Sequence, residues 1–306
     1  MKTGRPTLPV ERLKRAVQHV QGEVRWDEPL SHLLSLQVGG PADVLVIPSD
    51  VEDVIRVMQG ARAERIPFVV LGGTNVVVRD KGIRGIVMHL KHLTGIHEEA
   101  NQMVYAEAGI RLPRLMQFAS GRNLSGMEWA AGIPGTVGGG IVMNAGTRLG
   151  EMKDVLRGVD FVNLRGQRLR LDAANLAFAY RKTTLPKGIV VGGWVQLTLS
   201  TGEEVEAKTK AYLQYRRATQ PLTLPNAGSV FKNPPGDSAG RLIEAAGLKG
   251  TRVGDAEVST KHANFIVNRG TATAAQVLSL IRKVRQTVAR TFGVRLQLEW
   301  KIIGES

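Results

Sequence analysis

The sequence predicts an α+β fold with more than one domain, on three observations. The chain has 306 residues, which exceeds one small domain and fits about two or three units. Short apolar strand patterns and amphipathic helix patterns follow one another along most of its length. Residues 219–225 contain two prolines and no periodicity, which predicts an extended linker before a smaller α+β domain.

The first elements form two alternations of strand and helix. Residues 43–47 are predicted as a strand, and Ser49 with Glu52 forms a capping box that starts a helix ending at about Glu64. Residues 68–71 are predicted as a second, buried strand, followed by a glycine turn and a strand at residues 76–78. A strand after the turn differs from the helix that follows a P-loop.

The middle of the chain is predicted to complete this larger α+β body. Thr201 with Glu204 is a second capping box, heading a basic helix that ends near Arg217. The other predicted features are strands within residues 86–107, a helix at 112–121, a glycine-dense tract at 131–146, and strands at 156–163, 168–171 and 189–199.

The last part is predicted to contain two helices and several strands. A helix over residues 238–246 ends at Gly247, and strands lie near residues 256–258 and 265–267. A long helix over residues 273–292 begins with a capping box and has Gly293 just past its end. Alternation over residues 294–303 predicts a terminal strand with Glu299 on its polar face, where an exposed surface carboxylate is the ordinary interpretation.

Composition excludes several kinds of function. Without cysteine, the chain has no disulfides, thiolate metal sites or cysteine nucleophiles. No apolar run is long enough to span a bilayer, and residues 1–15 lack the hydrophobic region of a signal peptide, so we expect a cytoplasmic protein without membrane insertion. His89 and His92 would point to opposite faces of a strand, and we therefore expect no metal site.

The net charge of +14 at pH 7 predicts a surface that attracts anions. The basic residues are dispersed over different elements, and aromatic residues make up only 5% of the chain, which is poor for base stacking. Phosphorylated small molecules are therefore the favoured anions, and a basic nucleic-acid-binding protein remains a minor alternative.

The segment Asn226–Pro234 concentrates chemically useful groups. Gly228 permits close approach of a ligand, and Ser229 can donate or accept a proton. Lys232 offers a positive charge, and Asn233 offers a donor and an acceptor. Phe231 stands where a nucleophilic Gly-X-Ser-X-Gly serine would need glycine, which favours proton donation by Ser229 over nucleophilic attack.

Two glycine tracts could cradle a phosphate. Backbone N–H groups and side-chain donors are available in Gly72–Asn75, and over a longer stretch in residues 131–146. Tight turns explain either tract alone, but together, beside a third segment at residues 38–43, they indicate a ligand. Neither matches the Rossmann or Walker pattern, so a dinucleotide here requires another fold.

These motifs occur together, and in this order, in a known family. The chain resembles the UDP-N-acetylenolpyruvoylglucosamine reductases, the MurB-type flavoenzymes of peptidoglycan precursor synthesis, from about Val38 to Ile303. The resemblance rests on residues 38–43, 72–80, 131–146, 180–181, 220–221 with 226–234, 239–250, 261–265 and Glu299.

The resemblance implies a fold of the vanillyl-alcohol-oxidase (PCMH) type. It predicts an N-terminal helical segment at residues 1–30, an FAD-binding region at 31–218 with subdomains of about 31–90 and 91–218, and a substrate-binding domain at 219–306. FAD is the expected cofactor and NADPH the expected reductant. The implied FAD contacts are Gly39, Gly40, Gly72, Gly73, Thr74, Asn75, Ala131, Gly132, Ile133, Gly135, Thr136, Gly138, Gly139 and Asn144.

The implied reaction is reduction of the enolpyruvyl group of UDP-N-acetylglucosamine enolpyruvate to give UDP-N-acetylmuramate. Hydride addition pushes negative charge onto the substrate carboxylate, which an arginine and a protonated carboxyl group can stabilise. Arg181 and Glu299 match the family's residues for this role, and Ser229 matches its proton donor. Tyr180, Lys232 and Asn233 are expected to contact the substrate.

The sequence departs from the family pattern at two places, and other functions stay open. Leu34 replaces a small hydroxyl residue, and Thr183 replaces a common serine. We find no inserted tyrosine-bearing loop between Arg181 and Ser229, which is typical of the shorter of the family's two classes. An FAD-dependent sugar or alcohol oxidase of the same fold is the main alternative. His262 is expected to have a structural role or to position a substrate loop rather than to act in catalysis, and the protein is expected to be a monomer.

Overall fold

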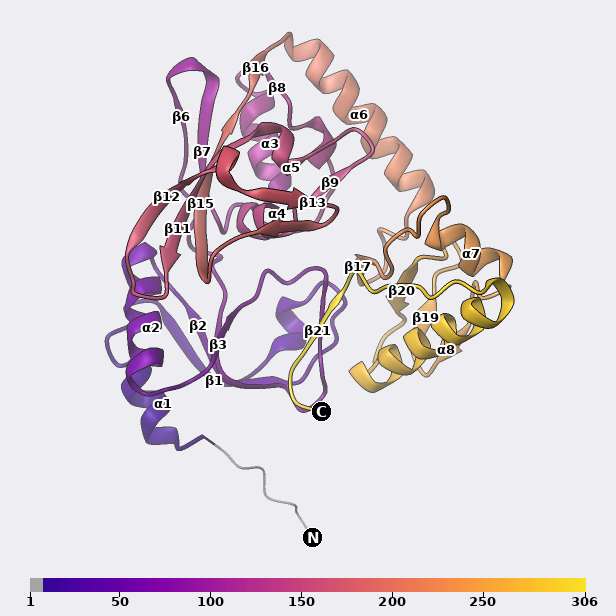
Figure 1. Ribbon diagram of the computed structural model, residues 1–306, viewed down its shortest axis with the longest axis horizontal. Coiled ribbons are helices and arrows are strands. Elements are labelled where there is room, and N and C mark those ends of the chain that lie inside the picture. The colour runs from indigo at the N-terminus through magenta and orange to yellow at the C-terminus, as the bar shows by residue number, and fades with distance from the viewer. Residues whose placement is uncertain (1–7) are drawn as a thin grey trace. The chain divides into compact units, whose positions relative to one another are not determined.

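The computed structural model describes residues 8–306 (Figure 1). Backbone contacts divide it into two compact units, each assembled from separate stretches of sequence. The first contains the described chain up to Trp26, Val44–Gly72 and Gly85–Gln214, and the second contains Asp27–Asp43, Gly73–Arg84 and Tyr215–Ser306. Of the predicted N-terminal helical segment, residues 1–7 lie outside the described range, and helix α1 spans Val10–Val17. The expected domain boundaries near residues 30, 90 and 218 stay predictions.

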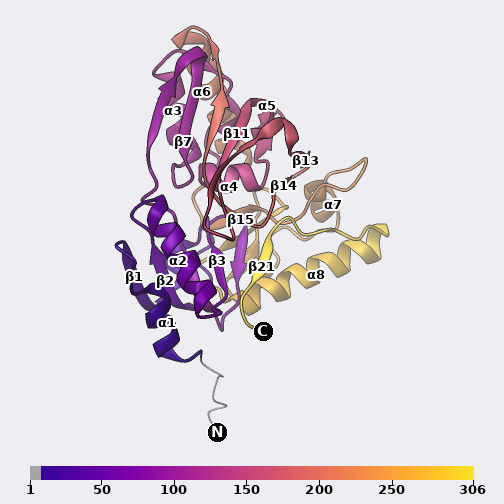
Figure 2. The ribbon, with the colours of Figure 1, turned by 60° about the vertical axis from the view of Figure 1, so that its left-hand side comes forward.

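The N-terminal layer of the first unit is a four-stranded sheet with helices α1 and α2 against it (Figure 2). The strand order is β1 (Glu23–Pro29), β2 (Pro41–Ile47), β5 (Ile83–Met88) and β3 (Phe68–Val70). The prediction of β3 as a buried strand is wrong on burial, because β3 is an edge strand and Val70 is 37% exposed.

Helix α2 (Val51–Ala63) begins one residue later than predicted. Its N-cap is Asp50, whose carboxylate accepts a hydrogen bond from the Asp53 backbone N–H at 2.8 Å, so the assignment of Ser49 as the cap is wrong. Ser49 instead forms a hydrogen bond with a residue in the first turn of the helix. Its own N–H donates to the buried Asp53 carboxylate at 3.1 Å.

A five-stranded antiparallel sheet forms the second layer of the first unit (Figure 1). Its order is β12 (Arg168–Asp172), β11 (Leu156–Asn163), β15 (Gly188–Gln196), β7 (Met103–Glu107) and β6 (Ile96–Glu99). Its core includes side chains of helices α3 (Leu112–Ser120) and α4 (Val137–Val142). The shorter elements are β8 (Leu124–Ser125), β9 (Gly146–Thr147), β10 (Gly150–Glu151), α5 (Met152–Val155), β13 (Ala177–Ala179), β14 (Lys182–Thr184) and β16 (Thr198–Leu199).

Helix α6 (Gly202–Thr219) follows and confirms the predicted basic helix. Thr201 accepts a hydrogen bond from the Glu204 N–H at 3.3 Å, whereas the Glu204 carboxylate accepts from the Ser200 hydroxyl, so only half of the predicted capping box forms. The helix runs to Thr219, past its predicted end near Arg217, which shortens the predicted linker. In the described part of the chain, no helix has the length and apolar character needed to cross a membrane.

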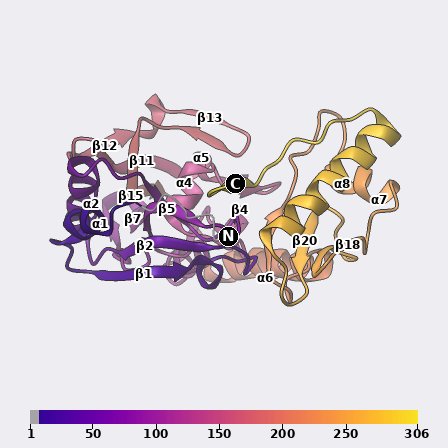
Figure 3. The same ribbon diagram turned by 90° about the horizontal axis from the view of Figure 1, so that it is seen from below.

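The second unit is built on a four-stranded sheet and helices α7 (Ala239–Ala245) and α8 (Ala274–Phe292) (Figure 3). The strand order is β17 (Asn226–Ser229), β20 (Phe265–Asn268), β19 (Ala256–Val258) and β18 (Arg252–Val253). The predicted capping box of Thr273 and Gln276 and the left-handed Gly293 at the end of α8 are confirmed.

The second unit also contains strands β4 (Val76–Val78) and β21 (Lys301–Ile303), which pair in parallel. The predicted terminal strand over residues 294–303 is therefore too long. Its first part pairs elsewhere, because Gln297 and Glu299 form backbone hydrogen bonds with Lys232 and Val230. Glu299 precedes β21 and is half-buried, so the exposed-surface interpretation of this carboxylate is wrong.

Candidate functional site

Ser229 lies at the end of β17, where a buried amide holds the backbone that follows it. Strand β17 places Ser229 opposite Phe265 of β20. The buried Asn264 accepts from the Phe231 N–H at 3.0 Å and donates to the Phe231 carbonyl at 2.8 Å. Its own carbonyl accepts from the Val230 N–H at 2.9 Å. Asn264, which the sequence did not single out from its motif, therefore fixes the chain next to Ser229.

Both backbone groups of Glu299 are hydrogen-bonded near Ser229. Its N–H donates to the Val230 carbonyl at 2.9 Å, and its carbonyl accepts from the Asn75 side chain at 3.3 Å. Asn75 was predicted as an FAD contact, and its position also links the Gly72–Asn75 turn to Glu299. The structure thus brings Ser229, Glu299 and Asn75 together within the second unit.

Asn233 has an additional structural role that the sequence did not indicate. Its side-chain oxygen accepts from the Ala239 N–H at 3.1 Å, which satisfies a free donor at the first residue of α7. The backbone N–H of Lys232 donates to the Gln297 carbonyl at 2.9 Å. Both residues are thereby fixed to neighbouring segments of the second unit.

Arg181 and Tyr180 form the turn of the β13–β14 hairpin in the first unit. Arg181 has a φ of 57°, which is unusual for a residue with a side chain, and its guanidinium lies 5.0 Å from the Tyr180 ring centre. The buried Asn144 donates to the Ala179 carbonyl at 3.3 Å, and the Thr183 hydroxyl donates to the Ile141 carbonyl. The predicted FAD contact Asn144 thus holds the hairpin that carries Arg181. Thr183, which stands where the family commonly has serine, keeps a hydroxyl group for this hydrogen bond.

The glycines of the predicted FAD segments fall into two groups, according to whether a methyl group in place of the hydrogen would collide with other protein atoms. A Cβ at Gly138 would lie 2.8 Å from the Ala108 Cβ, and at Gly40 it would lie 2.1 Å from the Asp80 carbonyl oxygen. Packing within the protein is by itself enough to require glycine at both positions. At Gly39 the Cβ would meet Leu34, the residue that departs from the family pattern, at 2.9 Å.

Gly72 differs from these packed glycines. Within the described chain no atom lies within 4 Å of the position its Cβ would take, and its φ is not in the left-handed range. Protein packing therefore does not require glycine here, whereas a ligand in close contact with the backbone would. Gly139 is similar, with only the Thr136 hydroxyl nearby at 3.6 Å. The residues present fit a bound FAD at these two positions.

Thr136 is the N-cap of α4 and accepts from the Gly139 N–H at 3.3 Å. Helix α4 lies inside the tract that the sequence marked only as glycine-dense, because glycine is a poor helix former and hides the pattern. Gly132 and Gly135 have φ angles of 69° and 123°, respectively, which only glycine adopts readily.

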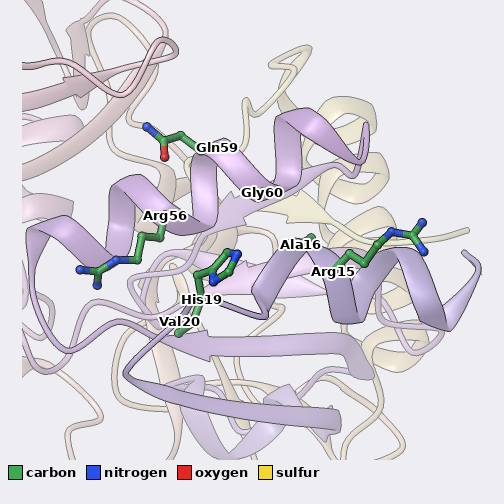
Figure 4. A pocket seen from close by; sticks show the side chains of 7 residues that line it. All are labelled: Arg15, Ala16, His19, Val20, Arg56, Gln59 and Gly60. Atoms are coloured by element: carbon green, nitrogen blue, oxygen red, sulfur yellow. The ribbon is translucent and has the colours of Figure 1, made fainter.

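The remaining histidines and one small cavity do not form a second site. Burial lowers the pKa of His262, whose Nδ1 accepts from the Asn264 N–H at 3.2 Å, so this residue supports the Asn264 loop as expected. Residues 8–306 contain no group of three or more His, Cys, Asp or Glu placed to hold a metal. A cavity of about 100 Å³ lies between α1 and α2, where the side chains of Arg15 and Arg56 point away from each other (Figure 4). Both arginines are paired with carboxylates.

Comparison with known proteins agrees with this geometry. Residues 42–172 match an FAD-binding domain family, and residues 220–303 match the UDP-N-acetylenolpyruvoylglucosamine reductase C-terminal domain family. UDP-N-acetylenolpyruvoylglucosamine reductase 2 of Symbiobacterium thermophilum is 47% identical over 97% of both chains. The reductase of Moorella thermoacetica is 46% identical over 92% of this chain and 94% of its own.

A crystal structure of UDP-N-acetylenolpyruvylglucosamine reductase from Thermus caldophilus superposes with a TM-score of 0.79 at 38% identity, covering 92% of this chain and 98% of that one. A berberine bridge enzyme is similar over 63% of this chain at 14% identity and a TM-score of 0.50, which shows a shared fold only. The predicted α+β architecture with an FAD-binding region is confirmed. The chain belongs to the UDP-N-acetylenolpyruvoylglucosamine reductase family.

Proposed function

We propose that this protein is an FAD-dependent oxidoreductase that uses NADPH to reduce the enolpyruvyl group of UDP-N-acetylglucosamine enolpyruvate, giving UDP-N-acetylmuramate for peptidoglycan synthesis. The observation that carries the proposal is the hydrogen bond that joins the half-buried Glu299 to Val230, the residue after Ser229, in a chain that is 47% identical to a reductase of this name. The family relationship supports FAD as cofactor and NADPH as reductant.

A bound FAD would supply the hydride chemistry that links NADPH to the substrate. Gly72 and Gly139 are the residues whose open backbone would allow it close contact. We propose the other predicted FAD contacts for the same role, with Gly138 and Gly40 also needed for packing.

Ser229 has the role of proton donor in this proposal. Hydride addition to the methylene carbon leaves a carbanion-like neighbouring carbon, which is basic enough to take a proton from a hydroxyl group. General acid catalysis of this kind contributes about 10²–10⁴-fold to a rate. The Asn264 hydrogen bonds, which fix the backbone after Ser229, keep this hydroxyl at a constant position.

Arg181 and Glu299 are proposed to stabilise the charge that develops on the substrate carboxylate. A guanidinium can meet both carboxylate oxygens, and a protonated Glu299 would donate a hydrogen bond to them. Tyr180, Lys232 and Asn233 are proposed substrate contacts. Because Tyr180 is 50% exposed, its ring is accessible to a ligand. We further propose a cytoplasmic monomer without a nucleic-acid partner.

Separate measurement of the two half-reactions tests this assignment. Ser229→Ala should leave reduction of the bound flavin by NADPH nearly intact and slow its reoxidation by the enolpyruvyl substrate at least about 100-fold. Ser238→Ala is the matched control, since it removes a hydroxyl that caps α7 in the same unit and should affect stability only. Equal slowing of both half-reactions in Ser229→Ala would refute the role of proton donor.

A further inference from the structure

Besides its backbone hydrogen bonds to Val230 and Asn75, Glu299 is held in position by a very short strand. Strand β21 follows it almost directly and pairs with β4 over three residues, from Lys301 opposite Val76 to Ile303 opposite Val78. A strand pair of this length has little stability of its own. A shift by one residue would turn every side chain to the other face, so that Leu298 or Trp300 would take the place of Glu299.

Gly304 occupies a position next to β21 that only a glycine can take, and this restricts how β21 can pair with β4. Its φ is 96°, and a Cβ there would lie 2.7 Å from the Gly82 carbonyl oxygen and 3.2 Å from the Arg79 nitrogen. Neither Ile303 nor Glu305, the residues that a one-residue shift would bring here, fits this backbone conformation and this space. Because the Gly82 turn lies so close to Gly304, strand β21 can pair with β4 in one register only.

Glu305 holds the same turn with its backbone and its side chain. Its N–H donates to the Gly82 carbonyl at 2.9 Å, and its carboxylate accepts from the Arg84 Nε at 3.2 Å. Arg84 also donates to Asp43, and its side chain is 20% exposed. A further hydrogen bond joins the Arg79 N–H to the Ile303 carbonyl at 2.9 Å. These contacts lie within the second unit and involve none of the proposed catalytic or substrate-binding residues.

We infer that Gly304, Glu305 and Arg84 are positioning residues for Glu299, because they fix the register of β21 on β4. The inference rests on the proposed function of Glu299. These residues act on Glu299 through the backbone of β21 and not by touching its side chain, and their loss should change the step that uses Glu299 while leaving flavin binding and flavin reduction as they are.

The test compares two glycines with the same backbone handedness in the same unit. Gly304→Ala should slow reoxidation of the reduced flavin by the enolpyruvyl substrate by about 100-fold, the usual cost of displacing a catalytic group by about 1 Å. FAD content and the rate of flavin reduction by NADPH should stay unchanged. Gly293→Ala is the control, since Gly293 has a φ of 70° but no described atom within 4 Å of its Cβ position, and it should reoxidise at the wild-type rate. Glu305→Ala removes a partly exposed ion pair and should slow reoxidation by about fivefold.

The Glu299→Gln background shows whether the effect passes through Glu299. Gly304→Ala should cause no further slowing there. Equal slowing in both backgrounds, slowing of both half-reactions, or an equal effect of Gly293→Ala would overturn the inference. A slow Glu299→Gln with a wild-type rate for Gly304→Ala would overturn the inference alone, whereas a wild-type rate for Glu299→Gln would refute the proposed function of Glu299.

Discussion

The tract at residues 131–146 and the turn Gly72–Asn75 are both glycine-rich, yet Gly138 and Gly140 of the tract differ from Gly72 of the turn in what surrounds them. Gly138 and Gly140 pack against Ala108 and Met152, where a methyl group would meet atoms at 2.8 and 3.0 Å, respectively. Gly72 faces open space within the described chain. A glycine count therefore does not separate residues that the fold needs from residues that a ligand needs, whereas the surroundings of each glycine do.

The largest effect should come from the open glycine. Gly72→Val should weaken FAD binding by about 100-fold, or about 3 kcal/mol, because the side chain would fill the space left for the cofactor. The melting temperature of the FAD-free protein should stay as in the wild type. Titration of the FAD-free protein with FAD, followed by flavin fluorescence, measures the affinity. Unchanged FAD affinity would contradict the assignment of this turn to the cofactor.

The packed glycine should give the opposite pattern. Gly138→Ala forces a methyl group against Ala108 and should lower the free energy of unfolding by about 1–3 kcal/mol, measured by urea denaturation of the FAD-free protein. The comparison would fail if Gly138→Ala lost FAD affinity at full stability, since Gly138 would then serve the cofactor as Gly72 does.

The smallest effect is expected at Asp53, which lies outside both tracts. Burial raises the pKa of this carboxyl group, but hydrogen bonds from the backbone of Gln21, Ser49 and Gly22 and from Arg56 outweigh that effect and lower its pKa below the ordinary value of 3.8. The lowered pKa gives stability that is complete above about pH 4 and is lost as the pH falls through the native value. Asp53→Asn should remove this acid-dependent contribution from unfolding curves measured between neutral and acid pH. Curves that keep the wild-type pH dependence would mean that another carboxylate is responsible.

Local rules were sufficient for much of the fold. Helix α8 was predicted with its capping residues, because the capping box and the closing glycine act within a few residues of the chain. The N-cap of α2 was missed because Ser49 and Asp50 are both good caps, and only the folded chain shows that Ser49 donates to Asp53 instead.

The candidate site was predictable where residue type determines chemistry, and less so where tertiary contacts do. Ser229 and Glu299 were identified from their motifs. The buried amides Asn264 and Asn268 were not singled out, because their partners lie far away in sequence. Asn268 donates to the Leu36 carbonyl at 3.2 Å, which no local pattern encodes. The register of β21 was also missed, since it depends on the distant Gly82 turn.

The proposed activity requires that a flavin on this chain pass a hydride from NADPH to an enolpyruvyl substrate. This requirement can be measured in the visible spectrum of the FAD-loaded protein, followed without oxygen. Addition of NADPH should bleach the flavin absorption, and subsequent addition of UDP-N-acetylglucosamine enolpyruvate should restore it with formation of one UDP-N-acetylmuramate per flavin. A flavin that stays reduced until oxygen is admitted would contradict the claim and favour an oxidase.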